Sequence, residues 1–416
     1  MSSTRRKLPL LAALYVSQAI PLGFFITAMP VILRTSGLSL ESVGLFSAIA
    51  LPWLIKFAWA PLIDRRPLGR RRYLSWIVPL QAAAVVCVAL LAALDLGSQL
   101  TLVIAVAAVF MLLAATQDIA SDGFAVSVLQ PHERGAGNAM QVGGYYLGQV
   151  LGGGVVLMVF SRFGWSVALL AMAAFLALPL VTAARYPEPT TGATAAGRAV
   201  GWRDLGRFFR RPGAGGWIAV VLLFRAGEAM ATYVFNQMLV DQGIALATIG
   251  VISGVVYAGG ALTGALCAGA LVHRLGRRRS LVGFVAVQGA ATLSYALAVG
   301  GGPIVLGVAA FVVAAAGGLA TTALYAGMMD ASSERTGATD FTLQQSLAAL
   351  GPLVGTALSG FSAARFGFAG HYLLCAALSF AVVALLLRAA PPRAPSPHRD
   401  LAPSHPTLST STGSSP

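Results

Sequence analysis

The sequence predicts an all-α membrane protein with twelve transmembrane helices, arranged as two six-helix bundles that repeat one another. Three observations lead to this prediction: a strongly apolar composition, twelve separate apolar runs, and motifs that recur at a constant spacing in the two halves of the chain.

The composition favours a membrane protein. Of the 416 residues, 57% are hydrophobic and only 10% are charged, and the mean hydropathy is +0.78. Soluble domains carry about 25% charged residues. The composition therefore argues against a soluble enzyme, a nucleic-acid binder and a disordered chain.

A helix needs about 20 apolar residues to cross the hydrocarbon core of a bilayer. Twelve such runs occur, and none alternates with the period of two residues that would indicate membrane strands. Because lipid offers no hydrogen bonds to the backbone, each run is expected to be helical. The runs lie at 8–33, 42–63, 73–94, 101–128, 139–160, 165–184, 216–240, 246–272, 280–299, 303–329, 341–361 and 369–387.

The distribution of arginine and lysine predicts that both termini lie in the cytoplasm. In this orientation 23 of the 28 basic residues fall on the cytoplasmic side, and only Arg34, Arg162 and Arg365 fall in outer loops. Lys56 and Arg225 lie within spans. The asymmetry also accounts for the net charge of +14 without nucleic acid as a partner.

The longest internal polar stretch divides six spans from six. We expect an N-terminal bundle over 1–184, a cytoplasmic linker over 185–215, a C-terminal bundle over 216–387 and a cytoplasmic tail over 388–416. The tail is rich in Pro, Ser, Thr and Arg, which predicts disorder. The first apolar run is long and lacks a small-residue cleavage pattern, so we expect a first span rather than a cleavable signal.

No pattern for catalysis, metal binding or a cofactor stands out. Cys87, Cys267 and Cys375 lie far apart in apolar runs, as small hydrophobic residues do. The five histidines are not paired at ligand spacing, and no phosphate-binding Gly-x4-Gly-Lys-Ser/Thr motif occurs. We therefore expect a protein that is not an enzyme and that uses no cofactor or metal.

The two halves repeat one another. Gln141, Gly148 and Gly152 recur 203 residues later as Gln344, Gly351 and Gly355, and the triplet Arg-Phe-Gly at 162–164 recurs at 365–367. The glycines follow an i, i+4 spacing that lets helices approach closely. Repeated six-span halves are typical of secondary transporters, which expose a central site to either side in turn.

A basic loop supports the same interpretation. Residues 269–279 read GALVHRLGRRR, and a related loop with Asp64 and a run of arginines lies at the equivalent place in the first half. This pattern resembles the loop signature of the major facilitator superfamily, which implies the major facilitator fold and a latch between the halves. A plain loop that follows the positive-inside rule is the alternative. The candidate gating residues are Asp64, Arg65, Arg70, His273, Arg274 and Arg277.

A narrower resemblance covers most of residues 15–165. Its blocks read PWLIKFAWAPLIDR (52–65), TQDIASDG (116–123) and ERGAGNAMQVGG (133–144). They resemble the AmpG-like muropeptide permeases and the RhtX/FptX-type siderophore permeases, which implies the bacterial inner membrane. The muropeptide permeases usually carry an aromatic residue and an Arg after the second Asp, where this chain has Gly123-Phe124-Ala125-Val126, and they are commonly longer. Both features favour the siderophore branch.

Charges within the spans are candidates for transport, because a charge in hydrocarbon costs at least a few kcal/mol. Lys56 lies on span two, and Asp118 and Asp122 share one face of span four. Lys56 and Asp118 can form a pair that is either structural or part of a proton relay or anion site. Asp122 lies nearer the inner end, which favours a gate or hydration role.

Span seven carries a second pair, Arg225 and Glu228, at an i, i+3 spacing. A carboxylate there could alternate between Arg225 and a proton, since burial and a neighbouring cation act on it in opposite directions. Glu228 is therefore the preferred proton-coupling residue, and Arg225 could instead attract an anionic substrate.

Further polar residues lie at expected cavity positions, and their aromatic rings and amides suit a bulky ligand. Packing or anchoring at the membrane interface is the alternative for the tyrosines. These residues are Tyr15, Gln18, Gln141, Tyr145, Tyr146, Gln149, Tyr233, Asn236, Gln237, Gln344 and Gln345.

The sequence thus predicts a secondary transporter that imports a ferric siderophore (pyochelin- or rhizobactin-like) by alternating access, with a proton as the possible coupling ion. The expected partners are a small molecule and the bilayer, and the expected state is a monomer. The alternatives are a muropeptide permease of cell-wall recycling, a drug or metabolite efflux transporter, and a membrane sensor or scaffold that moves no solute.

Overall fold

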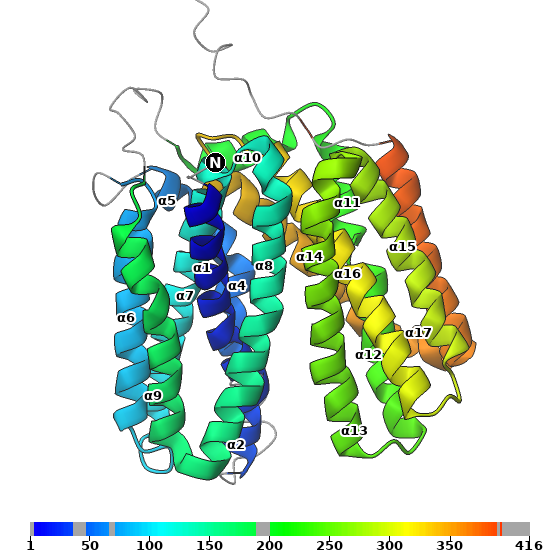
Figure 1. Cartoon of the computed structure of the whole chain (residues 1–416), viewed down its shortest axis with the longest axis horizontal. Coiled ribbons are helices and arrows are strands. Elements are labelled where there is room, and N and C mark those ends of the chain that lie inside the picture. The colour runs from blue at the N-terminus through cyan, green and yellow to red at the C-terminus, as the bar shows by residue number, and fades with distance from the viewer. Residues whose placement is uncertain (1–3, 36–46, 66–70, 189–199, 389–391, 393–416) are drawn as a thin grey trace, which may run out of the picture.

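A computed structural model of the chain describes residues 4–35, 47–65, 71–188, 200–388 and 392. Every regular element within these ranges is a helix (Figure 1). Arg70, residues 189–199 of the predicted linker and the predicted tail apart from residues 388 and 392 lie outside the described residues.

The N-terminal half contains six spans, some of them built from several helical pieces. Its elements, with η marking 3-10 and π segments, are α1 (Thr4–Gly23), η1 (Phe24–Ala28), α2 (Met29–Thr35), η2 (Ser47–Ala50), α4 (Leu51–Ile55), η3 (Lys56–Ala58), α5 (Ala60–Arg65), α6 (Leu74–Ala93), α7 (Leu100–Val128), η4 (Pro131–Glu133), α8 (Arg134–Gln149), η5 (Val150–Val155) and α9 (Val156–Arg185).

The C-terminal half follows a short helix, α10, that the sequence analysis did not predict. The elements are α10 (Trp202–Phe209), α11 (Ala214–Leu223), α12 (Ala226–Asp241), α13 (Leu246–Gly250), η6 (Val251–Val256), α14 (Tyr257–Leu275), α15 (Arg277–Leu297), α16 (Pro303–Ala331) and α17 (Gly337–Arg388).

These elements make twelve spans. Nine helical stretches among the described residues are long and apolar enough to cross a membrane. Two of them contain two spans each, because the chain leaves helical geometry at Gly164 (φ 80°) and at Gly367 (φ 67°), a left-handed region that favours glycine. The broken helix over 47–65 is the twelfth span. The predicted all-α fold of twelve transmembrane helices is confirmed.

The two halves pack in the same way. In the N-terminal half α1 packs on α8 and α6 packs on α9, and in the C-terminal half α12 and α15 pack on the two parts of α17. The turning glycines lie 203 residues apart, the spacing found between the repeated motifs. The halves meet where α8 packs on α14 and α16, and where α7 packs on α17.

Two spans that the sequence predicts to be continuous are interrupted. The second span is interrupted by a 3-10 turn at Lys56–Ala58, and α5 follows this turn. Pro61 contributes to this break, because it has no N–H to give to the preceding turn and fits the start of a new helix. The seventh is interrupted between Leu223 and Ala226, and Arg225 has φ −96° and ψ 0°.

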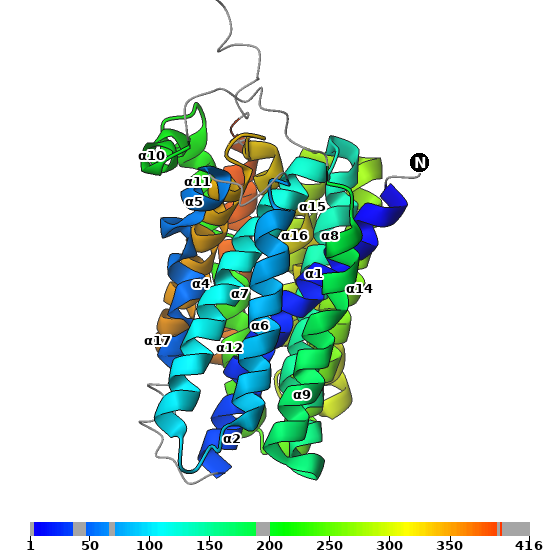
Figure 2. The same cartoon turned by 90° about the vertical axis from the view of Figure 1, so that its left-hand side faces the viewer.

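The two ends of the bundle carry different helix ends and connections. We call the end that carries α10 and the start of α1 the linker end, and it is uppermost in Figures 1 and 2. The first turn of α6 and the last turns of α14 and α16 also lie there (Figures 1 and 2). The opposite end carries the turn between spans five and six, which lies within α9.

Glycines let spans one and five come into contact. A Cβ atom at Gly152 would lie 1.9 Å from the carbonyl oxygen of Ile20, so no larger residue fits without movement of the backbone. In the C-terminal half, a Cβ atom at Gly351, the equivalent of Gly148, would lie 1.9 Å from the carbonyl oxygen of Leu222 on span seven. The close approach predicted from the glycine spacing is confirmed.

We expect Gly152→Ala to lower the thermal unfolding midpoint of the detergent-solubilised protein. The added methyl group forces η5 and α1 apart, which costs about 1–3 kcal/mol. Gly154→Ala is the matched control, because a Cβ atom there meets nothing within 4 Å and the position is exposed. Equal midpoints for the two variants would contradict the close contact.

Candidate functional site

The first buried charge cluster lies at the break in span two. Lys56 is 4% exposed and forms an ion pair with Asp118 of α7, as the sequence predicts. Its Nζ also donates to Oε1 of Gln345, 2.8 Å away on α17. Lys56 therefore joins span two to span four within one half and reaches the other half at the same time.

Asp122 lies one helical turn from Asp118 and is fully buried. Its Oδ1 accepts hydrogen bonds from the Tyr15 hydroxyl at 3.2 Å and from Nε2 of Gln141 at 2.9 Å. Its Oδ2 has no hydrogen-bond partner among the described residues. Three spans thus bring together residues that the sequence analysis selected separately.

The balance of charge in this cluster is uneven. It holds two carboxylates, Asp118 and Asp122, and one ammonium group, Lys56, all buried. With both carboxylates ionised the cluster carries one uncompensated negative charge, which is costly away from water. Uptake of one proton removes that charge. Gln18 of α1, which is also a predicted site residue, donates to Ser121, and Ser121 lies on α7 with Asp118 and Asp122.

The second charge cluster lies at the break in span seven. Glu228 is 2% exposed, and its two carboxylate oxygens accept from the Tyr257 hydroxyl at 2.8 Å and from Nε2 of Gln288 at 3.3 Å. Gly317 leaves the space for this carboxylate, because a Cβ atom there would lie 2.7 Å from Oε1. Three neighbouring spans therefore surround Glu228.

Arg225 is held less tightly than its partner. Its Nε lies 3.5 Å from Oε2 of Glu228, and this buried Nε has no hydrogen bond among the described residues. The side chain as a whole is 32% exposed. The predicted i, i+3 pair is present, and the guanidinium group keeps donors that another anion can use.

Tyrosines lie where the halves meet near this cluster. The rings of Tyr146 on α8 and Tyr257 on α14 are 6.4 Å apart, one from each half. Tyr145 packs edge-on against Tyr146 and accepts from Gln149 at 3.0 Å. Tyr145 is 40% exposed and Tyr233 is 44% exposed, so part of each ring remains available for contact.

Two predicted cavity residues have structural partners instead. Gln344 is completely buried, and its Oε1 accepts from the Trp217 indole at 2.7 Å while its Nε2 donates to the backbone carbonyls of Met328 and Asp340. The prediction that Gln344 lines a cavity is therefore wrong, because all its polar atoms are used in helix packing. Asn236 accepts from Ser253 within the C-terminal half.

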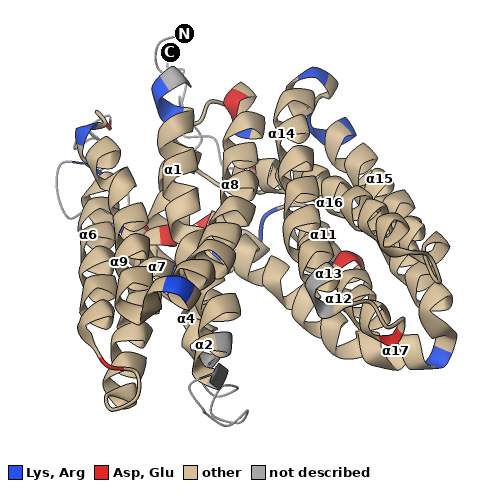
Figure 3. Cartoon of the chain, turned by 60° about the horizontal axis from the view of Figure 1, so that its bottom comes forward, with Lys and Arg blue, Asp and Glu red and all other residues tan. Residues whose placement is uncertain are grey.

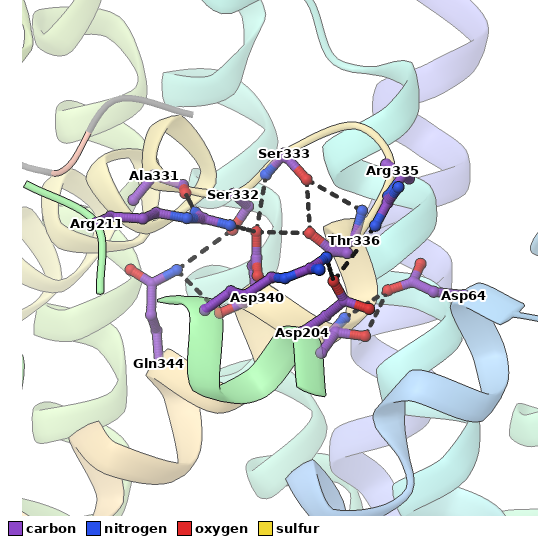
Figure 4. Close-up of polar contacts among 12 residues, drawn as sticks. Asp64, Asp204, Arg211, Ala331, Ser332, Ser333, Arg335, Thr336, Asp340 and Gln344 are labelled. Carbon is purple, nitrogen blue, oxygen red and sulfur yellow. Dashed lines mark hydrogen bonds and ion pairs between the residues drawn. The ribbon is translucent and has the colours of Figure 1, made fainter. Parts of the chain in front are cut away.

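The linker end holds a group of polar contacts, some of which join the halves (Figure 4). Asp64, at the end of α5, accepts from the backbone N–H of Thr339 at 2.8 Å and from its hydroxyl at 2.7 Å. These groups belong to the first turn of α17, where a carboxylate is favoured by the helix dipole. Tyr73 also donates to Asp64, at 2.7 Å, and Arg72 lies 3.2 Å away.

Arginines extend this latch. Arg72 donates to the carbonyl of Glu334 at 2.7 Å across the halves. Asp330 at the end of α16 forms ion pairs with Arg134 of the N-terminal half, at 2.6 Å, and with Arg277. Arg277 in turn donates to the carbonyl of Pro131. Basic residues gather at this end of the helices in Figure 3.

The position of Arg72 is fixed by its neighbours. Glu188, just beyond α9, accepts from the backbone N–H groups of Tyr73 at 3.0 Å and Leu74 at 2.9 Å and so caps α6. Burial raises the pKa of Glu188, and these two N–H groups act in the opposite direction. Arg71 donates to the carbonyl of Ala184.

The six predicted gating residues differ in whether they make contacts between the halves. Asp64 and Arg277 take part in contacts between the halves. His273 is exposed and its ring lies 6.5 Å from that of His132 across the halves. Arg65 and Arg274 are exposed, and Arg70 lies outside the described residues. The predicted gating residues did not include Arg72, Arg134, Asp330 or Thr339.

The sequence matches the profile of the Major Facilitator Superfamily over residues 11–340 and 217–412. This chain belongs to the Major Facilitator Superfamily. It is a multi-pass membrane protein and a secondary transporter, as predicted.

Similar proteins bear on the choice between the muropeptide permeases and the siderophore permeases. The anhydromuropeptide permease of Escherichia coli (strain K12) is 30% identical over 389 residues, which cover 91% of this chain and 78% of that protein. An uncharacterized protein of Haemophilus influenzae is 28% identical over 405 residues, 93% of this chain and 95% of that protein. The named relative favours the muropeptide alternative over the siderophore branch that the sequence analysis preferred.

Solved structures share the fold at low identity. The human organic anion transporter MFSD10 (TETRAN) has a TM-score of 0.74 and 16% identity over 92% of this chain and 99% of that chain. The Escherichia coli fucose:proton symporter has a TM-score of 0.72 and 14% identity over 93% of this chain and 98% of that chain.

We expect Lys56→Met alone to destabilise the protein by about 3–5 kcal/mol, because it leaves Asp118 buried without its cation. The double variant Lys56→Met with Asp118→Asn should recover part of this loss, and thermal unfolding of the unaltered protein, both single variants and the double variant measures it. Arg207→Gln is the control: it removes a pair whose arginine is 45% exposed, which costs about 0–1 kcal/mol. If the destabilisation of the double variant equalled the sum of the destabilisations of the two single variants, Lys56 and Asp118 would not interact as a pair.

Proposed function

We propose that this transporter imports a peptidoglycan-derived muropeptide across the bacterial inner membrane, coupled to protons, by alternating access. The observation that carries the proposal is the pair of buried charge clusters, one in each half. They lie beside Lys56–Gln345 and Tyr146–Tyr257, which are contacts between the halves in the middle of the bundle. The identity to the anhydromuropeptide permease supports the choice of substrate.

The side chains suit the chemistry of such a ligand. A muropeptide is a cell-wall sugar that carries a short peptide with carboxylates. Arg225 offers guanidinium donors for a carboxylate, and the partly exposed rings of Tyr145 and Tyr233 suit the faces of sugar rings. A ferric siderophore of anionic character would use the same groups, so substrates must be compared directly.

The orientation predicted from the basic residues gives the state of the molecule. With both termini in the cytoplasm, the linker end faces the cytoplasm and the contacts of Asp64, Arg72 and Asp330 close that side. The structure then corresponds to a conformation that receives substrate from the periplasm. The transporter acts as a monomer in this proposal, because each chain contains both halves.

Transport into proteoliposomes tests the substrate. Vesicles that contain the purified protein are given labelled anhydromuropeptide or labelled ferric siderophores, with and without an inward proton gradient. We expect accumulation of the muropeptide only, above the level of empty vesicles. Uptake of a siderophore alone would restore the siderophore branch, and movement of neither solute would overturn the proposal.

Proton coupling is assigned to Glu228, and Glu228→Gln tests it. The amide keeps the hydrogen-bonding shape but cannot exchange a proton, so we expect loss of gradient-driven accumulation while the protein still inserts and unfolds normally. Asp241→Asn is the matched control, because Asp241 is an exposed acid at the end of the same helix. Full gradient-driven uptake by Glu228→Gln would refute this role.

A further inference from the structure

The helix α10 lies at the linker end and is anchored to the C-terminal half. Asp204 is buried and caps the first turn through the backbone N–H of Gly201 at 2.9 Å. Its other oxygen lies 3.3 Å from Arg335. Phe208, one turn later, is completely buried, so this face of α10 is fixed.

Arg211, two residues after the end of α10, also attaches the helix to the C-terminal half. Arg211 forms an ion pair with Asp340 at 2.7 Å and donates to the carbonyl of Ala331 at 2.6 Å (Figure 4). Only four residues separate Phe209 from Ala214, where span seven begins. The chain length therefore keeps α10 close to the surface of the membrane.

The other face of α10 carries exposed aromatic and basic side chains. Trp202 is 56% exposed and Phe209 is 47% exposed, and they lie seven residues apart on one stripe of the helix. Arg203 and Arg210 have the same spacing and are exposed beside them. The single acid of the helix, Asp204, points the other way and is already paired.

We propose that the outer face of α10 binds the headgroups of anionic phospholipids at the membrane surface. Aromatic residues with arginines on one helix face are typical of helices that lie in the membrane interface. The rings enter the boundary between headgroups and acyl chains, and the guanidinium groups pair with phosphates. Charge complementarity and the short connection to span seven favour lipid over an acidic protein as the occupant.

Lipid at α10 would act on the latch through contacts that the structure contains. Asp204 holds Arg335, and the loop that carries Arg335 supplies carbonyl oxygens to Arg72 of the other half. A helix held at the membrane surface keeps this loop in place. The lipid site is independent of the transported substrate.

Quenching of Trp202 by brominated lipids tests the proposal. The protein is reconstituted in vesicles of brominated phosphatidylglycerol or brominated phosphatidylcholine, and Trp202→Phe defines the part of the fluorescence that Trp202 supplies. We expect Trp202 to be quenched more strongly by phosphatidylglycerol, and added salt should reduce the difference. The double variant Arg203→Gln with Arg210→Gln should lose it.

Arg279→Gln with Arg388→Gln is the matched control, because it removes two exposed arginines from the same end. This control should keep the preference for phosphatidylglycerol, and size-exclusion profiles show that each variant is folded. Equal quenching by both lipids in the unaltered protein would overturn the proposal, as would an equal loss in the control. Absence of quenching by either lipid would also overturn it and leave an acidic protein as the occupant to examine.

Discussion

The fold depends on how charges are accommodated inside apolar helices. A charged side chain in hydrocarbon is stable only when another charge or several hydrogen bonds compensate it. Lys56 and Glu228 meet this requirement with partners on neighbouring spans, and Lys56 also reaches Gln345 in the other half. The charges thus determine which helix faces point inward, and they place titratable groups where the halves meet.

Much of this arrangement is encoded locally. The length of the apolar runs predicted all twelve spans, because it depends on the composition of each run alone. The repeat of motifs at a spacing of 203 residues predicted that the two halves pack in the same way. The pair Arg225–Glu228 was predictable because residues three apart share a helix face. The breaks in spans two and seven were not, because an apolar run has the same composition whether its helix is continuous or interrupted.

Contacts between distant loops were the least predictable. An arginine in a cytoplasmic loop follows the positive-inside rule whether it faces water or a carbonyl of the other half. Arg72 and Arg134 therefore could not be separated from Arg65, which is exposed. Gln344 was misassigned for a related reason: an amide on a span suits a cavity or a packed interface equally, and only its partners distinguish the two.

The repeat preserves packing and not chemistry. At a spacing of 203 residues Asp118 corresponds to Thr321 and Asp122 to Tyr325, and the bounds of α7 and α16 differ by the same number. Gln141 contacts Asp122, whereas its equivalent Gln344 holds the indole of Trp217. The N-terminal half thus carries its charges on spans two and four, and the C-terminal half on span seven.

This difference bears on how the halves can exchange conformations. Opening the linker end separates Asp64 from Thr339, and Arg72 from the carbonyl of Glu334. Water can replace the partner of Arg72, which is exposed, whereas Asp64 and Thr339 are buried and lose hydrogen bonds that are shielded from water. Lys56 is buried, and separation from Gln345 removes a hydrogen bond where water is scarce. Both the linker end and the middle of the bundle therefore contribute to the energy of the transition, and the middle is where a bound substrate or a proton has most influence.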